Sequence, residues 1–547
     1  MSGDAREDAV GLNLELLTGW PSGSAVAEDY LQEQGDADAF FRGHFTDGQA
    51  YQAKAQEVDQ RFDRDARRRA ADALTVPPGG DEGALEAFVE EGGYVVTTGQ
   101  QPGLFCGPLY NLYKGLTAAA LARFLQEEMG VPVLPVFWIG SEDHDWAEAN
   151  HTAIIGMDNE LHRAEAAHPD PDRGAALNRL SLGNGVDQVR DAFLAELPDS
   201  DFSAPWKELV EASFHPGTTL ASGFHAVVGE MLGRFGVYLT DAADPVVKEA
   251  SRPILLRELD ESEALEGVLR ETAARLEEAG YEQQVTLMED GVNLFLETEA
   301  GRERLYRDHE GFRLHTSGDV VSRDELLTRL ESDAGALSPN VLLRPVAESS
   351  VFPTLAYVAG PGEMAYFAQL GDYFQAMGIR MPIVHPRGSA TLVESKIRKV
   401  LEKFGLDVDH LRRPFHEIAG EIARDEVPAA VQKAMGMLRG SVAQGVSKVE
   451  SEVARVDPTL KGPAQSVRSA AFQALDELEK KVTQAVKREN EIALAQLEKA
   501  QLHLFPDGVP QERVVNPLYY LTRYGGAVLD GLFDSFAADV RRAQASR

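Results

Sequence analysis

The chain has 547 residues, 44% of them hydrophobic and 8% aromatic, a composition that supports a large apolar core and more than one domain. It carries 88 acidic and 53 basic side chains, and the net charge of −35 argues against general affinity for nucleic acid or anionic membranes. A negatively charged substrate would therefore need a local basic pocket. Because lysine is sparse and acidic side chains are in excess, adaptation to a high-salt cytoplasm is a further hypothesis.

The single cysteine, Cys106, excludes intrachain disulfides and cysteine-rich zinc clusters, and it fits a reducing cytoplasm. We interpret it as a small buried side chain, since no neighbouring residues mark it as a nucleophile. The N-terminal sequence MSGDARED lacks the basic and apolar regions of a secretory signal. No apolar run reaches the roughly 18 to 20 residues of a membrane span, so a cytoplasmic protein without a membrane partner is expected.

Helices and loops are predicted for residues 1–90, and a strand–loop–helix–strand unit follows them. The strands are predicted over residues 94–98 and 133–138, with a loop at 100–107 and an apolar helix from near Pro108 to near Gly130. This order is typical of a parallel sheet, which binds ligands beyond the carboxyl ends of its strands.

The same alternation returns further along the chain. A helix over residues 218–235 precedes a strand at 237–240, and strands at 354–359 and 382–385 flank another helix. Residues 152–215 and 281–335 interrupt the pattern, the latter with short hairpin strands, and are predicted to be insertions. We therefore expect an α/β fold: a Rossmann-like doubly wound parallel sheet core over residues 1–414 with two inserted connecting segments.

Residues 415–505 have a different pattern, with apolar side chains three and four apart along two arms. Proline-containing breaks separate the arms, so an antiparallel α-helical coiled-coil domain is predicted. Such a surface usually binds another protein, and we expect a homodimer. The apolar tail, residues 506–547, is expected to pack on the core. The predicted seam comprises Val431, Met435, Leu438, Val442, Val446, Val449, Val453, Val456, Val467, Ala471, Leu475, Leu478, Val482, Ala485, Ile492, Leu497 and Leu504.

The loop after the first strand is a candidate ligand site. It contains neither the GxGxxG nor the GxxxxGK[ST] nucleotide motif, but Gly107 and Pro108 suit the start of a helix that holds an anion. Two adjacent glutamines after a buried strand have no packing purpose, which favours ligand binding over a plain turn with solvated side chains. The polar candidates of this unit are Thr98, Gly99, Gln100, Gln101, Gly107, Asn111 and Lys114.

A second candidate follows the strand at 133–138, where carboxylates alternate with histidine. A histidine beside a carboxylate is suited to proton transfer near neutral pH, so His144, backed by Asp143 or Asp145, is a candidate acid–base group. The alternative is an acidic strand end that caps the next helix. Since the spacing matches no standard metal motif, no metal site is predicted. Glu142 and His151 complete this set.

Polar residues also follow the later strands. Asp241 ends the strand at 237–240, and Arg344, His385 and Arg387 are candidate anion contacts. After the last Gly-Pro-Gly turn, Glu363 stands in the first turn of a helix, where the helix dipole favours a carboxylate. The remaining candidates are Gly360, Gly362, Tyr366 and Gln369.

Four long motifs resemble one known family, the cysteine-adding enzymes of bacillithiol biosynthesis. They are TGQQPGLFCGPLYNLYK, PVFWIGSEDHDWAEANH, VYLTDAADP and PTLAYVAGPGEMAYFAQL, and the resemblance covers nearly the whole chain. It implies a Rossmann-like core with two connecting segments, a coiled-coil homodimer, and ligation of cysteine to glucosaminyl-malate. The positions that match lie at 98–101, 107–110, 142–145, 241 and 360–363.

The resemblance implies amide formation, most simply through an acyl-adenylate made from ATP, with Mg²⁺ accompanying the nucleotide. His144 would take the amine proton, and Lys114 or Arg387 would offset phosphate charge. The chain lacks HxGH and KMSKS signatures and a cysteine-based zinc site, so the activation step and the selection of cysteine stay open. Two other interpretations also stay open: a non-catalytic nucleotide-binding dimeric scaffold, and a nucleotidyltransferase acting on a sugar.

Overall fold

The computed structural model describes residues 7–8, 13–21 and 23–545, and the chain divides into two compact units. One unit comprises Met1–Leu392 and Glu512–Arg547, and the other is Val393–Gln511. The N-terminal stretch on which the secretory-signal prediction rests lies almost wholly outside the described residues. Among the helices that are described, none is long and apolar enough to cross a membrane.

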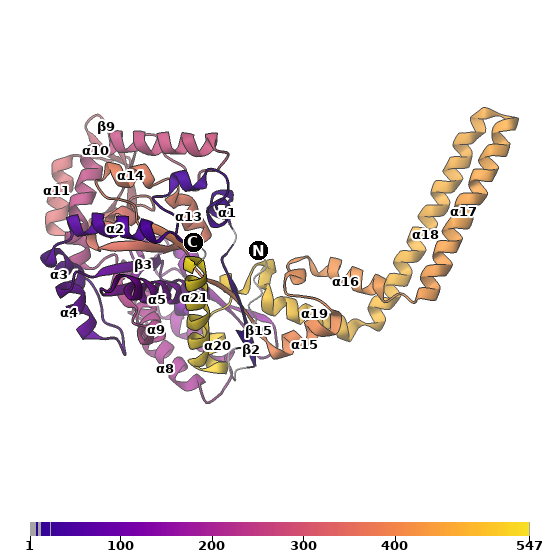
Figure 1. Ribbon diagram of the computed structural model, residues 1–547, viewed down its shortest axis with the longest axis horizontal. Helices are drawn as coiled ribbons and strands as arrows, with labels where there is room; N and C mark the ends of the chain where they lie inside the picture. Colours follow the sequence, from indigo (N-terminus) through magenta and orange to yellow (C-terminus); the bar gives the residue numbers. More distant parts are fainter. Residues whose placement is uncertain (1–6, 9–12, 22, 546–547) are drawn as a thin grey trace. The chain divides into compact units, whose positions relative to one another are not determined.

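A five-stranded parallel sheet forms the centre of the first unit (Figure 1). Its order is β14-β13-β3-β4-β7. Along the chain, β4 and β7 are added on one side of β3, and β13 and β14 are then added on its other side. This reversal is the switch point at which doubly wound sheets bind ligands. The predicted Rossmann-like core is confirmed, with strands β3 (Tyr94–Gln100), β4 (Val133–Ile139), β7 (Tyr238–Asp241), β13 (Thr354–Ala359) and β14 (Ile383–Pro386).

Helices cover both faces of this sheet, which is why its strands are buried along nearly their whole length. Val96 and Phe137 pack in the main core with α5 (Tyr110–Met129). The intervening Val95 and Val136 point to the opposite face, where α3 (Arg64–Asp72) and α4 (Glu82–Glu90) cover them.

Helix α5 begins later than the sequence predicts. Gly107 and Pro108 were expected to start it, but a 3₁₀ turn, η2 (Leu104–Cys106), comes first and the helix begins at Tyr110. Phe105 and Cys106 adopt positive φ angles of 48° and 79°, and this backbone turns the chain before the helix can start. The C-terminal tail holds the turn, because Asn516 Nδ2 donates to the Phe105 carbonyl at 2.8 Å.

Between β4 and β7 lies the first insertion. It contains α6 (Trp146–Ala149), a hairpin of β5 (His151–Ile155) and β6 (Leu161–Glu165), η3 (Leu177–Arg179), and helices α7 (Gly185–Ala195) and α8 (Ser203–Ser213). Helix α9 (Leu220–Leu232) and η4 (Gly233–Phe235) lead into β7. Helix α10 (Pro245–Glu278) follows, capped by Asp244, whose carboxylate accepts from the Val246 amide at 2.8 Å.

The second insertion forms a separate antiparallel sheet of order β11-β10-β9-β8-β12. Helix α11 (Arg323–Ser332) begins with a capping box formed by Ser322 and Glu325, and α12 (Arg344–Val351) returns the chain to β13. Helices α13 (Pro361–Phe367) and α14 (Gly371–Ala376) then connect β13 to β14. The strands are β8 (Gly291–Thr298), β9 (Gly301–Asp308), β10 (Gly311–Leu314), β11 (Val320–Val321) and β12 (Leu337–Pro339).

The two ends of the chain complete the first unit. Near the N-terminus, α1 (Ala25–Gln32), η1 (Ala37–Phe40) and α2 (Gly48–Arg61) precede α3, and β1 (Glu7–Asp8), β2 (Leu14–Gly19) and β15 (Ser389–Glu394) form a small sheet. In the tail, α20 (Leu518–Tyr524) leads to α21 (Ala527–Ala545), which packs along α5. The Phe536 and Tyr113 rings lie 5.5 Å apart in this contact.

The second unit is helical. Helices α17 (Ala429–Val456) and α18 (Lys461–Glu489) form an antiparallel hairpin, joined by η6 (Pro458–Leu460) at the predicted break. The second arm is shorter than predicted, because the helix is interrupted at Asn490 and α19 (Glu491–Leu504) packs instead on α15 (Ser395–Phe404) and α16 (Phe415–Asp425). This packing extends the unit beyond the predicted range of 415–505. Leu497 and Leu504 therefore belong to that packing and not to the coiled-coil seam.

Candidate active site

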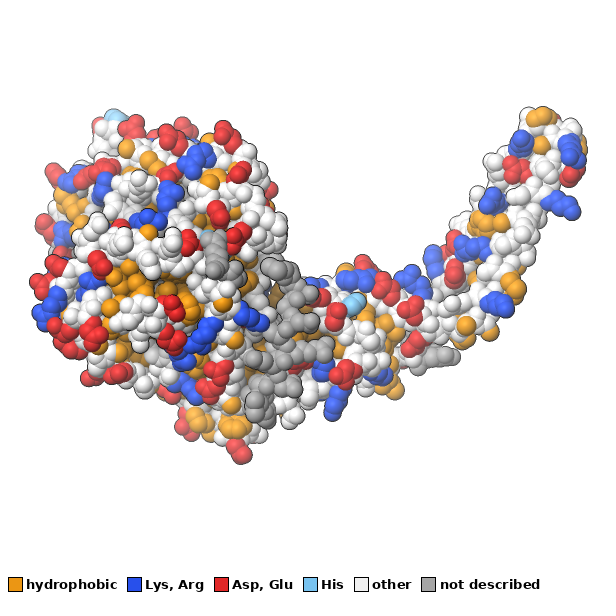
Figure 2. All heavy atoms as spheres, viewed as in Figure 1, with side chains coloured by type: hydrophobic (Ala, Val, Ile, Leu, Met, Phe, Trp, Pro, Cys, Tyr) orange, Lys and Arg blue, Asp and Glu red, His pale blue; other side chains and the backbone are white. Residues whose placement is uncertain are grey.

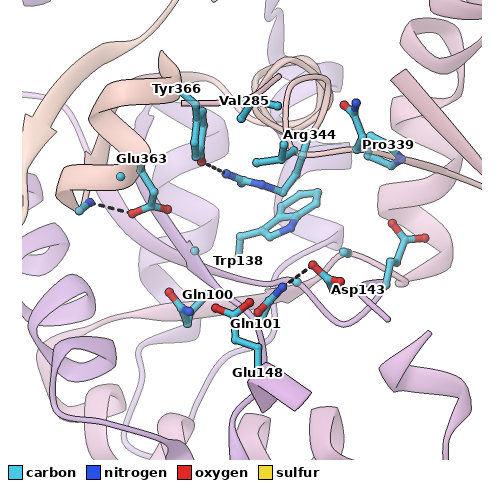
Figure 3. A pocket seen from close by; sticks show the side chains of 18 of the residues that line it. Gln100, Gln101, Trp138, Asp143, Glu148, Val285, Pro339, Arg344, Glu363 and Tyr366 are labelled. Carbon is cyan, nitrogen blue, oxygen red and sulfur yellow. Dashed lines mark hydrogen bonds between the residues drawn. The ribbon is translucent and has the colours of Figure 1, made fainter. Parts of the chain in front are cut away.

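A cavity of about 650 Å³ opens beyond the carboxyl ends of β3, β4 and β13, at the switch point of the parallel sheet (Figure 3). The second insertion forms another wall, and the tail contributes Arg513. The cavity brings together most of the predicted site residues: Gly99, Gln100, Gln101, Lys114, Glu142, Asp143, His144, Arg344, Gly360, Gly362, Glu363, Tyr366 and Arg387.

Three of the residues predicted around β3 and α5 do not line the cavity and instead make local structural contacts. The Thr98 hydroxyl donates to the Val358 carbonyl at 2.9 Å, which ties β3 to β13. Gly107 has a φ of 64°, so it serves the turn before α5. Asn111 Nδ2 donates to the Cys106 carbonyl at 2.9 Å and braces the same turn. The predicted anion site at Gly107 is therefore not part of this cavity.

Four further candidates also lie outside the cavity lining. Asp145 caps α6 by accepting from the Glu148 amide at 3.0 Å, the structural alternative considered for this segment. His151 is exposed, with Nδ1 3.0 Å from the Ala147 carbonyl. Gln369 is buried, and its amide donates to the Val285 carbonyl at 3.0 Å. Asp241 accepts from the Ser141 hydroxyl and from the Ala243 amide at 2.8 Å.

Two more predicted site residues, His385 and Arg387, make contacts within the fold. His385 is fully buried, and burial lowers its pKa to about 4, so it is neutral and packs against Trp20 at 5.5 Å. Arg387 lines the cavity, yet its Nη2 already donates to Glu512 Oε1 at 2.6 Å, with both side chains buried.

The sequence did not reveal the contribution of the second insertion. Strand β9 places Arg302 and Arg304 in the cavity, and β8 places Phe295 between them, with guanidinium carbons 4.0 Å and 5.3 Å from its ring centroid. The alternating pattern of residues 291–308 does predict a hairpin. It carries no information about which cavity that hairpin covers, because this depends on tertiary packing.

Arg302 fixes the state of His144. Its Nη1 lies 3.3 Å from His144 Nδ1, and because an arginine can only donate, Nδ1 accepts and the ring proton resides on Nε2. Burial and the charge of Arg302 lower the pKa of His144 from its ordinary value, although Asp143 opposes this. His144 is thus a neutral imidazole that offers an N–H donor to a ligand.

The pKa values of two carboxylates in this segment, Asp143 and Glu148, are shifted in opposite directions. Although burial opposes it, Arg302 and a hydrogen bond from Gln101 hold the pKa of Asp143 below its usual range. Burial, Asp145 and Asp143 raise the pKa of Glu148. Figure 3 shows Gln101 between Asp143 and Glu148 on one side of the cavity. Of these two carboxylates, Glu148 is therefore the better proton acceptor.

Another part of the cavity wall contains an ion pair between buried Lys114 and partly buried Glu363. Lys114 Nζ lies 2.6 Å from Glu363 Oε2 and donates to the Gly99 carbonyl at 2.7 Å and to Gln100 Oε1 at 2.9 Å. The other contacts of Glu363 come from the Gly360 amide and the Tyr357 hydroxyl, both at 2.7 Å. Lys114 therefore links the end of β3 to the start of α13 in the cavity wall.

Arg344 also lines the cavity. Its Nη2 donates to the Tyr366 hydroxyl at 2.7 Å and its Nη1 to Glu348 Oε2 at 2.9 Å (Figure 3 shows the first contact). Burial raises the pKa of Glu348 to about 7, although Arg344 opposes this. Arg344 and Tyr366, which the sequence offers as separate candidates, thus contact each other at the cavity.

The cavity is rich in cations in a protein whose net charge is −35. Arg304 and Arg513 have no carboxylate partner among the residues that the structure describes, so their charge is directed to solvent or a ligand. Gln101 Oε1 and Trp138 Nε1 are buried and, within the described parts of the chain, lack a hydrogen-bond partner. Six basic side chains line the cavity: Lys114, Arg302, Arg304, Arg344, Arg387 and Arg513.

Metal-ligating side chains cluster elsewhere. In the described ranges, the group of three that could share one ion is Asp158, His162 and Glu196, at the β5–β6 hairpin and α7. His162 Nε2 lies 3.0 Å from Asp158, and that hydrogen bond raises the pKa of His162. None of these three lines the cavity at the switch point.

A doubly wound parallel sheet with a cation-rich cavity at its switch point defines a Rossmann-like α/β protein with a candidate site for an anionic small molecule. The family model "Bacillithiol biosynthesis BshC, N-terminal Rossmann-like domain" matches residues 13–388, and "Bacillithiol biosynthesis BshC, C-terminal coiled-coil domain" matches residues 390–539. The chain belongs to the BshC family of bacillithiol biosynthesis.

Relatives in this family are similar over most of the chain. A protein named "Putative cysteine ligase BshC" from Salinibacter ruber is 36% identical over 465 residues, 84% of each chain. Its namesake from Chlorobaculum tepidum is 34% identical over 462 residues, 80% of each chain. The protein of that name from Heliobacterium modesticaldum is 30% identical over 533 residues, 94% of this chain and 96% of its own.

Proposed function

We propose that this protein is a cytoplasmic ligase that joins the carboxyl group of cysteine to the amine of glucosaminyl-malate, the final step of bacillithiol biosynthesis. The observation that carries the proposal is the cation-rich cavity lined by Glu148 and by His144, whose Nδ1 lies 3.3 Å from Arg302 Nη1. Family membership supports the substrates, and the cation-rich lining suits the two carboxylates of a malate group.

ATP is the proposed activating substrate. The carboxylate oxygen of cysteine attacks the α-phosphorus, pyrophosphate leaves, and the acyl-adenylate forms. The amine then attacks the acyl carbon, one proton is lost, and AMP leaves with one former carboxylate oxygen. Without a glycine-rich phosphate loop, Arg304 and Arg513 are the side chains whose charge is available to the phosphates. Any Mg²⁺ would accompany the nucleotide, as no resident metal site is proposed in this cavity.

The structure changes the role expected of His144. With Nδ1 occupied by Arg302, the ring donates through Nε2, a geometry suited to stabilising the oxyanion that develops on the acyl group. Glu148, whose pKa is raised, accepts the proton of the attacking amine. Asp143 accepts from the His144 backbone amide at 2.7 Å and so positions this segment, whereas Asp145 caps α6.

The acidic limb of the pH–rate profile should report Glu148. A base acts when ionised, so kcat falls as pH drops through a pKa above the ordinary glutamate value. The charge of Asp145 helps to raise that pKa, and Asp145→Asn keeps the helix cap while removing the charge. We expect the limb to move to lower pH in this variant. A limb that stays in place in steady-state assays would contradict Glu148 as the base.

A homodimer through the second unit is also proposed. Helix α17 buries none of its side chains in the single chain, and apolar side chains on the hairpin are exposed: Met437 60%, Val449 54% and Val467 61% (Figure 2 shows hydrophobic side chains along this arm). A second copy that covers them would remove this surface from water.

Sedimentation at micromolar concentration tests the dimer. The full chain is expected at twice its mass of 59.6 kDa. Val449→Glu combined with Val467→Glu should give monomers, because two charges would be buried in the interface. The control, Val320→Glu, changes an exposed valine outside this unit and should leave the dimer intact. A monomeric wild-type chain would refute the proposal.

The reaction itself is tested with purified full-length protein, cysteine, glucosaminyl-malate and ATP. The expected result is the amide product with one AMP released per amide. Tight nucleotide binding without product would instead support a non-catalytic scaffold. Product with release of ADP would keep the ligase and replace the adenylate by an acyl phosphate.

A further inference from the structure

A second cavity of about 400 Å³ adjoins the first in the same unit. Glu142 lines both cavities and therefore stands in the wall between them. The charged and amide side chains of the second cavity are Glu142, Asn178, Arg179, Lys248, Glu297 and Asp333. Nothing in the proposed chemistry of the first cavity uses the last five of these.

Glu297, at the end of β8, has a buried carboxylate oxygen that lacks a hydrogen-bond donor within the described residues. Its side chain is 9% exposed, and Oε1 accepts no hydrogen bond from the described residues; the nearest cation, Arg173 Nη2, lies 3.9 Å away. Asn178 Oδ1 in the same cavity is also buried and has no donor in the described chain. Buried acceptors without donors are costly, so these two oxygens favour a ligand that carries N–H donors.

Lys248 provides the complementary group at the shared wall. It is 2% exposed in its side chain, and Nζ donates to Glu142 Oε1 at 2.6 Å and to the Leu337 carbonyl at 2.7 Å. An ammonium group has three N–H donors, so one is left for a ligand carboxylate at the boundary of the two cavities.

We propose that this second cavity binds the α-amino acid substrate as a zwitterion, with its ammonium on Glu297 and Asn178 and its carboxyl group at the Lys248–Glu142 wall. This places the carboxyl carbon where the larger cavity can deliver the activating nucleotide and the sugar amine. The inference rests on the proposed ligase function and adds the location and the recognition of cysteine.

The charged side chains that line each cavity indicate which substrate it binds. The second cavity has three carboxylates and two basic side chains, which suits a small ligand with a cationic end, whereas six basic side chains line the first. Burial raises the pKa of Glu297 although Arg179 and Arg173 oppose it, and a substrate ammonium would favour its ionised form. A zinc-bound thiol is not needed if the amino acid is selected by its ammonium and carboxylate.

Equilibrium dialysis of the full-length protein with radiolabelled cysteine, without ATP or sugar acid, tests this site. Wild type should bind one cysteine per chain and should bind 3-mercaptopropionate, which lacks the ammonium, at least about tenfold more weakly. Glu297→Gln should weaken cysteine binding by about tenfold or more. It should also bring the ratio of the affinities for cysteine and 3-mercaptopropionate close to one. Glu299→Gln, an exposed glutamate two residues along, is the matched control and should behave as wild type.

Asn178→Leu is a second, independent variant, and it should also weaken the binding of cysteine. The site is overturned if wild type does not distinguish cysteine from 3-mercaptopropionate, or if Glu297→Gln leaves cysteine binding and the KM for cysteine unchanged while amide still forms. If cysteine binding follows the expected pattern but no amide is made, the amino-acid site stands and the ligase function fails.

Discussion

His144→Ala is expected to lower kcat by about 10²–10³, the cost of removing one donor to a developing oxyanion. The reason is that Arg302 holds Nδ1 and leaves Nε2–H as the catalytic donor. His144→Gln, which retains an N–H donor, should lose less activity than His144→Ala. If His144 were the general base, glutamine would be as damaging as alanine, and the two variants therefore separate the roles in a steady-state assay of amide formation.

The matched control is His151→Ala, seven residues further along the chain. His151 is exposed, lies outside the cavity lining and contacts the Ala147 carbonyl, so its removal should change kcat less than about twofold. Full activity of His144→Ala would remove His144 from the mechanism.

Lys114→Met is expected to destabilise the protein by about 3 kcal/mol, because it leaves the largely buried Glu363 carboxylate, 18% exposed, without its cation. The substitution also removes the donors to the Gly99 carbonyl and Gln100. Adding Glu363→Gln should recover part of the loss, since the neutral amide still accepts from the Gly360 amide. Urea unfolding of the single and double variants measures this coupling.

Lys207→Met is the control for this substitution. Its partner, Asp199, is 97% exposed in its side chain, so loss of that ion pair should change the free energy of unfolding far less than Lys114→Met does. Strictly additive effects of Lys114→Met and Glu363→Gln would show that the pair is not coupled and that Lys114 acts only through packing.

The parallel core is predictable from local sequence. Each core strand is a short apolar run between turn residues, and the polar residues after β3, β4 and β13 meet because parallel strands end at one edge. Lys114 and Glu363 were both expected at the site for this reason. Their ion pair was not predicted, because the two lie in different βαβ units and only the strand order brings them together.

The remaining features depend on contacts between distant segments. The delayed start of α5 requires the backbone at Phe105 and Cys106, which the tail fixes through Asn516. The state of His144 depends on Arg302, 158 residues away in sequence. The end of the coiled coil at Asn490 depends on the packing of α19 on α15, whereas the apolar periodicity continues through it.

The central claim is that the cavity at the switch point of the sheet is the reaction site. A crystal structure of the full chain with glucosaminyl-malate and a non-hydrolysable ATP analogue tests it most directly. The expected result is the sugar amine within hydrogen-bond distance of Glu148, the malate carboxylates on cavity arginines, and the nucleotide phosphates near Arg304 and Arg513. Both ligands bound elsewhere, with this cavity containing only water, would contradict the claim.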